Sequence, residues 1–295
     1  MLRMSASRVS LPGAMTDSAT PRASASRATS SPRFVIRQRR GFILPDLREL
    51  WHYREIVYFL SWRDVKVRYA QTMLGAAWTL LQPLALMLLF TYAFSRVGSV
   101  KTGSVPYPLF ALAGVAFWTF FARAVTGGSE SLVQNAALLT KVYCPRILIP
   151  ISTIMAALAD LTLSLVLLIG VAAVYDYYPT WRLVLLPAAV LLGVLLIAGV
   201  TFLFSAINVR FRDIGQALPF LVLSWLFLSP VAYPVQNRVF ELNPLAGVID
   251  AFRWCVLGTP VTASSLLLAG SITVGLLVVG TGYFVRAERT FADIA

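Results

Sequence analysis

The side chains that most enzymes use for catalysis or cofactor binding are scarce in this chain of 295 residues. A nucleotide-binding P-loop needs a lysine directly after a glycine, because that lysine must reach the phosphates cradled by the loop. Lys66, Lys101 and Lys141 are the only lysines, and each follows another residue type. The single histidine, His52, cannot supply an H-E-x-x-H zinc site, and two cysteines cannot form a cysteine-rich metal site. The sequence therefore predicts no metal site and no cofactor bound by this chain.

Asp160 stands near the middle of a long apolar run, residues 147–174. If that run crosses a membrane, a carboxyl group at its centre is a candidate functional site. Thr153, Thr162 and Ser164 are close in sequence, so two interpretations stay open. Asp160 takes part in a proton relay, or it is a structural or pore-lining group that is hydrogen-bonded between helices.

Aromatic side chains form a second set of candidates. Their rings can stack on the C–H faces of sugars, a kind of contact that contributes roughly 0.5–1.5 kcal/mol beyond area burial. They can also anchor helices at the membrane surface. Both interpretations stay open for two groups of aromatic residues. One lies within the run 106–126 and the other within and just after the run 215–232: Phe117, Trp118, Phe120 and Phe121, then Trp225, Phe227 and Tyr233.

The composition identifies the framework that must position these side chains. Hydrophobic residues make up 58% of the chain and charged residues only 13%, against about 45–50% and 25% in soluble domains. This predicts an all-α polytopic membrane protein, because helices satisfy their own backbone groups in lipid. The net charge of +12 does not indicate nucleic-acid binding, since 13 of the 25 basic residues lie among the first 70 residues and most others lie between apolar runs.

Six apolar stretches are long enough to cross a hydrocarbon core of about 30 Å. An even number of spans places both termini on one side, and assigning them to the cytoplasm puts 20 of the 25 basic residues inside, as the positive-inside rule requires. Cys144 then lies inside and Cys255 outside, so they cannot form a disulfide with each other. The predicted spans are 75–97, 106–126, 147–174, 183–207, 215–232 and 264–285.

Three further segments complete the predicted organisation. Residues 1–33 are rich in Ser and Arg and indicate a disordered cytoplasmic tail, with a transit peptide as a weaker interpretation. Arg39-Arg40 weakly resemble a twin-arginine signal. Within the region 34–74, residues 46–69 show helical spacing of aromatic and apolar residues, which predicts an amphipathic helix in the headgroup layer or packed in the cytoplasm. The transmembrane domain covers 75–285, and 286–295 form a cytoplasmic tail.

Two connections have recognisable helix signals. In the external stretch, Asn243 and Pro244 are typical of a helix start and Gly258 of a helix end, and the segment between them is too short and too charged to span. We expect an amphipathic helix that dips into the outer leaflet. The loop from Gly127 to Arg146 has an apolar stripe, which predicts a short cytoplasmic helix on which a soluble partner could dock.

Several motifs resemble ABC-2 type permeases of the polysaccharide and polyol phosphate export family. The resemblance covers about residues 45–295. It is carried by the block Trp62-Arg63-Asp64-Val65-Lys66-Val67-Arg68-Tyr69, followed by Gln71-Thr72, Leu74-Gly75, Trp78 and Leu81-Gln82-Pro83, and by Lys141-Val142-Tyr143, Pro145-Arg146 and Thr290-Phe291-Ala292-Asp293.

This resemblance implies a homodimer of six-helix subunits with two copies of a separate ATPase, which binds the ATP and magnesium. It implies that the helix at 46–69 flanks the cytoplasmic entrance and that the helix at 129–143 docks on the ATPase. It also implies that residues 234–258 shape an external gate and that the aromatic residues above line a sugar channel. The implied entrance residues are Trp51, Trp62, Arg63, Lys66, Arg68 and Tyr69; the coupling residues are Leu139, Lys141, Tyr143, Pro145 and Arg146; the gate residues are Pro234, Asn243, Pro244, Asp250 and Arg253.

The expected function is therefore export of an undecaprenyl-linked polysaccharide, most simply O-antigen, across a bacterial inner membrane. The alternatives are an ABC-2 permease for teichoic acid, capsule, galactan or a small drug or lipid, and an integral membrane enzyme acting on lipid-linked sugars. The enzyme would need paired acids or a metal site, and the sequence offers no convincing set.

Overall fold

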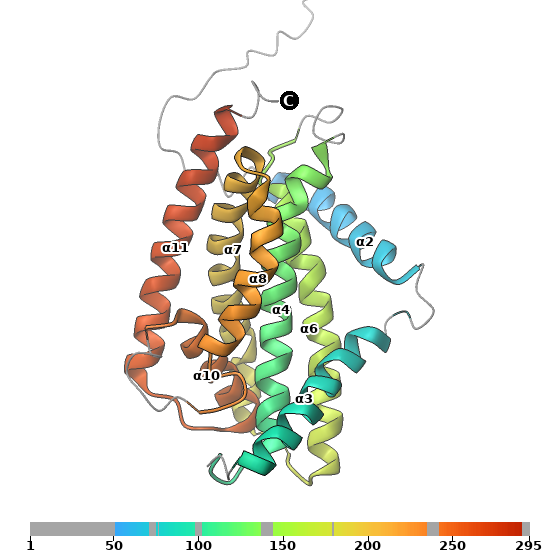
Figure 1. Cartoon of the computed structure of the whole chain (residues 1–295), viewed down its shortest axis with the longest axis vertical. Helices are drawn as coiled ribbons and strands as arrows, with labels where there is room; N and C mark the ends of the chain where they lie inside the picture. The colour runs from blue at the N-terminus through green and yellow to red at the C-terminus, as the bar shows by residue number, and fades with distance from the viewer. Residues whose placement is uncertain are drawn as a thin grey trace, which may run out of the picture. The chain divides into compact units, whose positions relative to one another are not determined.

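The computed structural model describes residues 51–70, 75, 77–97, 102–136, 144–178, 180–234 and 242–290, all within one compact unit, Phe42–Ala295 (Figure 1). The predicted tail 1–33 and the predicted start of the first helix at Asp46 lie outside this part. Over the described residues the chain is helical and contains no strand, as the composition predicts. The elements are α2 (Arg54–Ala70), α3 (Ala77–Val97), α4 (Tyr107–Gln134), α6 (Leu148–Val174), the 3-10 helix η1 (Trp181–Leu185), α7 (Leu186–Arg210), α8 (Asp213–Leu228), α10 (Pro244–Leu257) and α11 (Ala263–Thr290).

Five segments among the described residues are long and apolar enough to cross a membrane: Ala77–Phe94, Tyr107–Gln134, Leu148–Val174, Trp181–Arg210 and Ala263–Glu288. They match five of the six predicted spans. The remaining prediction, 215–232, corresponds to α8, an apolar helix of 16 residues, somewhat shorter than the roughly 20 residues that a perpendicular span needs. The multi-pass helical architecture is confirmed, whereas the count of six spans stays a prediction.

Two span ends differ from the sequence prediction. We expected the second span to end at residue 126, but α4 continues to Gln134, and Leu132 packs in a small cluster with Phe202 and Phe284. The apolar stripe assigned to a separate loop helix therefore begins inside α4, because its first side chain, Leu132, is buried in this cluster. The last helix also runs beyond residue 285, to Thr290.

The centre of the bundle is α4, which packs against α3, α6, α7, α8 and α10. Nineteen of its 28 residues are buried. Because lipid tails are as apolar as these side chains, close packing and hydrogen bonds between helices hold such a bundle together. The pair α7 and α11 shows this directly: a Cβ added at Gly280 would lie under 3.0 Å from the carbonyl oxygen of Gly199, so only glycine permits this approach.

Helix α2 packs along the side of α6 (Figure 1). The Ser61 hydroxyl donates to the carbonyl of Ser152 at 3.0 Å, and two turns later Arg68 pairs with Asp160. Along α2 the side chains of Val57 and Val65 are half-buried, whereas Trp62 is 59% exposed. The headgroup-layer position of α2 stays a prediction.

Candidate functional site

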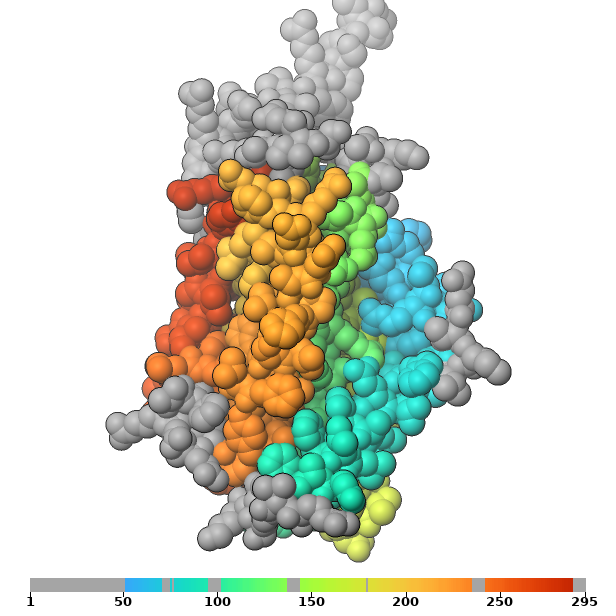
Figure 2. Space-filling view, in the orientation of Figure 1, coloured from blue at the N-terminus to red at the C-terminus, as the bar shows by residue number. Residues whose placement is uncertain are grey.

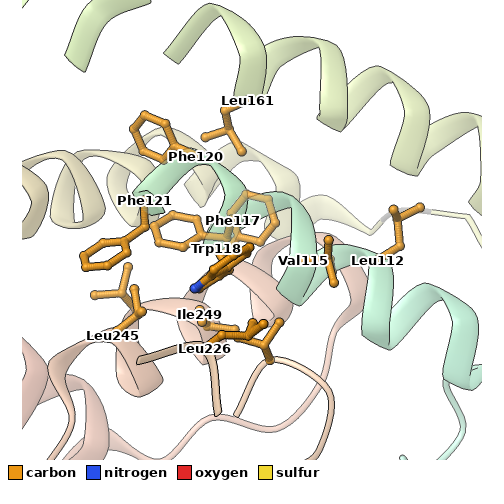
Figure 3. Packing of buried hydrophobic residues seen from close by; sticks show 14 of the residues in the cluster. Leu112, Val115, Phe117, Trp118, Phe120, Phe121, Leu161, Leu226, Leu245 and Ile249 are labelled. Atoms are coloured by element: carbon orange, nitrogen blue, oxygen red, sulfur yellow. The ribbon is translucent and has the colours of Figure 1, made fainter. Parts of the chain in front are cut away.

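The aromatic residues predicted to line a channel divide into two groups. Phe117, Trp118, Phe120 and Phe121 of α4 are 0–7% exposed and lie in the core of the single chain. Figure 3 shows them among Leu161 of α6 and apolar residues of α8 and α10. The Phe117 ring packs edge to face on Phe120, 5.8 Å between centroids.

A channel-lining role for these four residues does not agree with their packing. Helix α4 is enclosed by other helices over this stretch, so its aromatic rings face the packed core of the single chain and no open path. The second group differs: Phe227 is 68% exposed, and Trp225 and Tyr233 are half-buried. Only the second group can contact a substrate or a partner without repacking the core.

The external segment contains the helix that the sequence predicted, with the predicted ends. The Asn243 side chain accepts a hydrogen bond from Leu245 N at 3.1 Å, Pro244 is the first helical residue, and Gly258 ends α10 at a φ of 69°. Asn243 also donates to the Ser229 hydroxyl at 2.8 Å and accepts from Trp225 Nε1 at 3.1 Å. One side chain therefore caps α10 and joins it to the end of α8.

Helix α10 does not expose the polar face that an amphipathic helix would have. Twelve of its 14 residues are buried, including Arg253, so protein surrounds almost the whole helix. Asp250, half-buried, lies 3.8 Å from the Arg253 guanidinium. The amphipathic interpretation failed because Arg253 lies in the interior, where it compensates for its burial with hydrogen bonds.

Arg253 is the centre of this enclosed region. It donates to the carbonyl oxygens of Phe110 (3.1 and 3.2 Å), Pro230 (2.7 Å) and Val231 (2.6 Å), and its guanidinium stacks 3.6 Å from the centroid of the Phe110 ring. Gly114 makes room for it, since a Cβ there would lie under 3.0 Å from both Arg253 Nη2 and the Val231 oxygen. Arg253 thus fastens α10 to α4 and to the turn after α8. Of the other predicted gate residues, Pro234 is half-buried.

Asp160 is the centre of a second polar cluster, whose members come from distant parts of the sequence. It pairs with Arg68 of α2 and with Arg123 of α4, whose Nη1 lies 3.1 Å from its Oδ2, and it accepts a hydrogen bond from the Tyr69 hydroxyl. Arg123 also donates to Gln82 of α3 at 2.7 Å. The structural interpretation of Asp160 is therefore favoured, with ionic partners in place of the nearby threonines and serine.

The Tyr69 hydroxyl shares this cluster with Thr79 at 3.0 Å. Burial and the hydrogen bond with Asp160 raise the pKa of Tyr69 above its ordinary value. The phenol stays protonated at physiological pH and donates to the carboxylate. The cluster, which we call the Asp160 cluster, comprises Arg68, Tyr69, Thr79, Gln82, Arg123 and Asp160.

The remaining entrance residues do not converge. Trp51, Trp62 and Lys66 are exposed, whereas Arg63 donates to Asp64 (2.8 Å) and to Asn135 beyond the end of α4 (2.9 Å). Only Arg68 and Tyr69 of the predicted set share a site.

Leu139, Lys141 and Tyr143 of the predicted coupling loop lie outside the described residues. Pro145 and Arg146 form the turn before α6, and the Arg146 backbone N–H donates to Glu288 of α11 at 3.3 Å. The two cysteines are free, as predicted. Among the described residues no group of three or more His, Cys, Asp or Glu side chains could hold a metal ion.

Sequence reasoning missed Arg123, Gln82 and Gly114. Arg123 could have been predicted as a member of a polar cluster, because an arginine inside an apolar run needs a charged or polar partner as much as an acid does. The need for glycine at position 114 depends on an arginine 139 residues further along the chain, so no local pattern could have revealed it.

A family model for ABC-2 type transporters matches residues 55–257, more than half of the chain. The chain belongs to the ABC-2 type transporter family, and it is a multi-pass membrane transport subunit. It is 30% identical over 256 residues to the O-antigen export system permease protein RfbA of Myxococcus xanthus, covering 84% of this chain and 98% of that protein. A Klebsiella pneumoniae protein of the same name is 25% identical over 81% of this chain and 95% of its own length. The polysialic acid transport protein KpsM of Escherichia coli is 22% identical over 66% of this chain and 78% of its own length.

Proposed function

We propose that this chain is the membrane permease of an ATP-driven exporter that moves an undecaprenyl-linked polysaccharide, O-antigen in the first place, across the bacterial inner membrane. The observation that carries the proposal is the similarity to the Myxococcus xanthus permease over 98% of that protein's length. The lower identity and coverage of the polysialic acid transporter favour O-antigen over a capsular polymer. Teichoic acid and galactan are the remaining polymer alternatives.

A separate ATPase supplies the energy in this proposal. All three lysines of the chain lack a preceding glycine, so ATP and magnesium bind to the partner, in two copies per exporter. The ATPase pushes on the C-terminal end of α4 and on the cytoplasmic connection that follows it. Both termini face the cytoplasm, which agrees with the concentration of basic residues in the N-terminal region.

The sugar path runs between two copies of the chain. Each hydroxyl in bare hydrocarbon would cost several kcal/mol, so a polymer needs a continuous protein wall. Within one chain the core is filled, whereas α3 and α8 present large apolar side chains on one face of the molecule (Figure 2). We assign this face to the dimer interface and the sugar path, with Tyr92, Phe220 and Phe227 as wall residues, 62–71% exposed.

Reconstitution into proteoliposomes with and without the cognate ATPase tests the function. Lipid-linked O-antigen should reach the far side only when the permease, the ATPase and ATP are all present. Movement without the ATPase, or none with it, would refute the proposal.

Two phenylalanine variants distinguish a residue of the proposed sugar path from a residue of the packed core. Phe227→Ala should slow polymer export and leave the protein stable, because its ring contacts the path. Phe121→Ala, the control, should lower stability, because its ring fills the core between α4 and Trp225. A permease for a small drug or lipid would export normally with Phe227→Ala.

A further inference from the structure

Helix α2 has little protein around it. Leu60 is the only buried residue among the 17 of this helix. The hydrogen bond of Ser61 and the Asp160 cluster join α2 to α6, whereas large side chains such as Tyr58 and Trp62 are exposed. An amphipathic helix of this kind completes its packing with lipid chains.

An apolar groove runs along the contact between α2 and α6. It has a volume of about 520 Å³, within the size range of ligand pockets. On α6 it extends from Leu148, the first residue of the helix, to Ala159. At a rise of 1.5 Å per residue this stretch is about 17 Å long, close to half of a hydrocarbon core of about 30 Å. The groove therefore has the length of one leaflet and suits an acyl chain.

The two ends of the groove lie at different depths. The Ser61 hydroxyl donates to the carbonyl of Ser152, and two turns further on Tyr69 donates to Asp160, so α2 and α6 run parallel. Arg54, the first residue of α2, therefore lies near the N-terminal end of α6, where this helix leaves the hydrocarbon. A lipid with its phosphate at Arg54 and its chain directed toward the level of Asp160 has the orientation of the adjoining leaflet.

The mouth of the groove carries an uncompensated positive charge. Among the described residues that line the groove, Arg54 alone is charged, and the neighbouring Glu55 does not line it. The Arg54 guanidinium lies 5.2 Å from the centroid of the Trp51 ring, and in the described part of the chain it has neither an ion pair nor a hydrogen bond. A guanidinium that stacks on an aromatic face keeps its N–H edge for phosphate oxygens.

We infer that this groove binds an anionic phospholipid of the surrounding membrane, with its phosphate on Arg54 and one acyl chain between α2 and α6. In the orientation proposed above, the lipid belongs to the cytoplasmic leaflet. The headgroup compensates the charge of Arg54, and the chain covers the apolar face that α2 leaves open. The lipid is a structural ligand that completes the packing of α2. The inference goes beyond the proposed function, because it does not depend on what the chain transports.

Photolabelling of the full chain in nanodiscs of phosphatidylglycerol and phosphatidylcholine tests the inference. Either lipid in turn carries a diazirine in its acyl chain, and labelled peptides are mapped after irradiation. Val274, Val278 and Val279 of α11 are exposed and give the reference for ordinary lipid contact. The readout is the preference for phosphatidylglycerol in the groove, divided by the preference at α11. Wild type should give a ratio of about five, which corresponds to about 1 kcal/mol for one basic residue at an anionic lipid surface.

Two pairs of variants test the headgroup site and the chain site separately. Arg54→Gln should lower the ratio to about one, and Arg54→Lys should retain most of it because the charge remains. Arg210→Gln, the same change at the exposed end of α7, should leave the ratio unaltered. Ala159→Phe should fill the groove and lower its labelling by both lipids, whereas Val166→Phe, at an exposed position of α6 outside the groove, should not. Unchanged labelling of α11 shows that each variant is folded.

Four results would overturn the inference. A wild-type ratio near one would leave ordinary lipid contact only, and a preference that survives Arg54→Gln would exclude Arg54 as the headgroup site. Undiminished labelling in Ala159→Phe would place the acyl chain elsewhere. A groove labelled by neither lipid would be covered by protein, either another segment of this chain or a partner. The assay needs neither an ATPase nor a polymer, so its outcome is separate from that of the proposed function.

Discussion

Replacing Gly114 with alanine tests the packing around Arg253. A Cβ at this position would lie under 3.0 Å from Arg253 Nη2 and from the Val231 oxygen, so one of them must move. The displaced Nη2 donates to Val231 at 2.6 Å and to Phe110 at 3.1 Å. Each hydrogen bond from a charged group contributes about 1.5–3 kcal/mol, and alanine returns about 1 kcal/mol through its higher helix propensity. If both bonds are lost, we expect a net loss of about 2–5 kcal/mol.

Gly170→Ala is the matched control. Gly170 lies within α6, a helix that crosses the same bundle, and nothing lies within 4 Å of a Cβ added there. This variant should gain up to about 1 kcal/mol from helix propensity alone. The two glycine variants should therefore differ by about 3–6 kcal/mol in the free energy of unfolding, measured by SDS titration of the purified protein in one detergent.

A double-mutant cycle identifies the cause. In an Arg253→Met background the guanidinium is absent, so Gly114→Ala should cost less than it does in the native chain. Residues in direct contact usually show a coupling of about 0.5–3 kcal/mol. If Gly114→Ala and Gly170→Ala change stability alike, or if the cycle shows no coupling, the assignment of Gly114 as the space for Arg253 is refuted.

Three further predictions use the same unfolding measurement. Gly280→Ala should destabilise the α7 and α11 pair because its Cβ would meet the Gly199 carbonyl, whereas Gly275→Ala in open space should not; equal effects would contradict the packing argument. Asn243→Ala should cost about 1–2 kcal/mol through the lost cap of α10, and a loss no larger than that of an exposed substitution would argue against the cap. Tyr69→Phe should cost about 1 kcal/mol, equally from about pH 6 to 9, because burial raises the pKa of Tyr69 and the hydroxyl is protonated throughout; a cost that changes within this range would show that the phenol titrates.

The sequence predicts the helices well and their lipid-facing and core-facing sides poorly. Apolar runs of span length locate five helices within a few residues at most ends, because a bilayer sets their minimum length. The caps of α10 follow from local turn chemistry at Asn243, Pro244 and Gly258. The burial of Phe121 and the exposure of Phe227 could not be predicted, since core and lipid favour the same apolar side chains.

The two polar clusters were hidden for a different reason. Asp160 stands 92 residues from Arg68 and 37 from Arg123, and Arg253 stands 143 residues from Phe110. The sequence shows only that each charge interrupts an apolar or amphipathic pattern and so needs a partner. Pairing every such charge with every other would have included Arg123 among the candidates, because few charges occur within the predicted spans.

Helix α4 connects both polar clusters. Arg123 pairs with Asp160 in the C-terminal half of α4, and Phe110 and Gly114 contact Arg253 near the N-terminal end of α4. The intervening residues, Phe117 to Phe121, are buried, and close packing of this kind has low compressibility. The four buried aromatic residues therefore join the two clusters through one continuous packed stretch of α4.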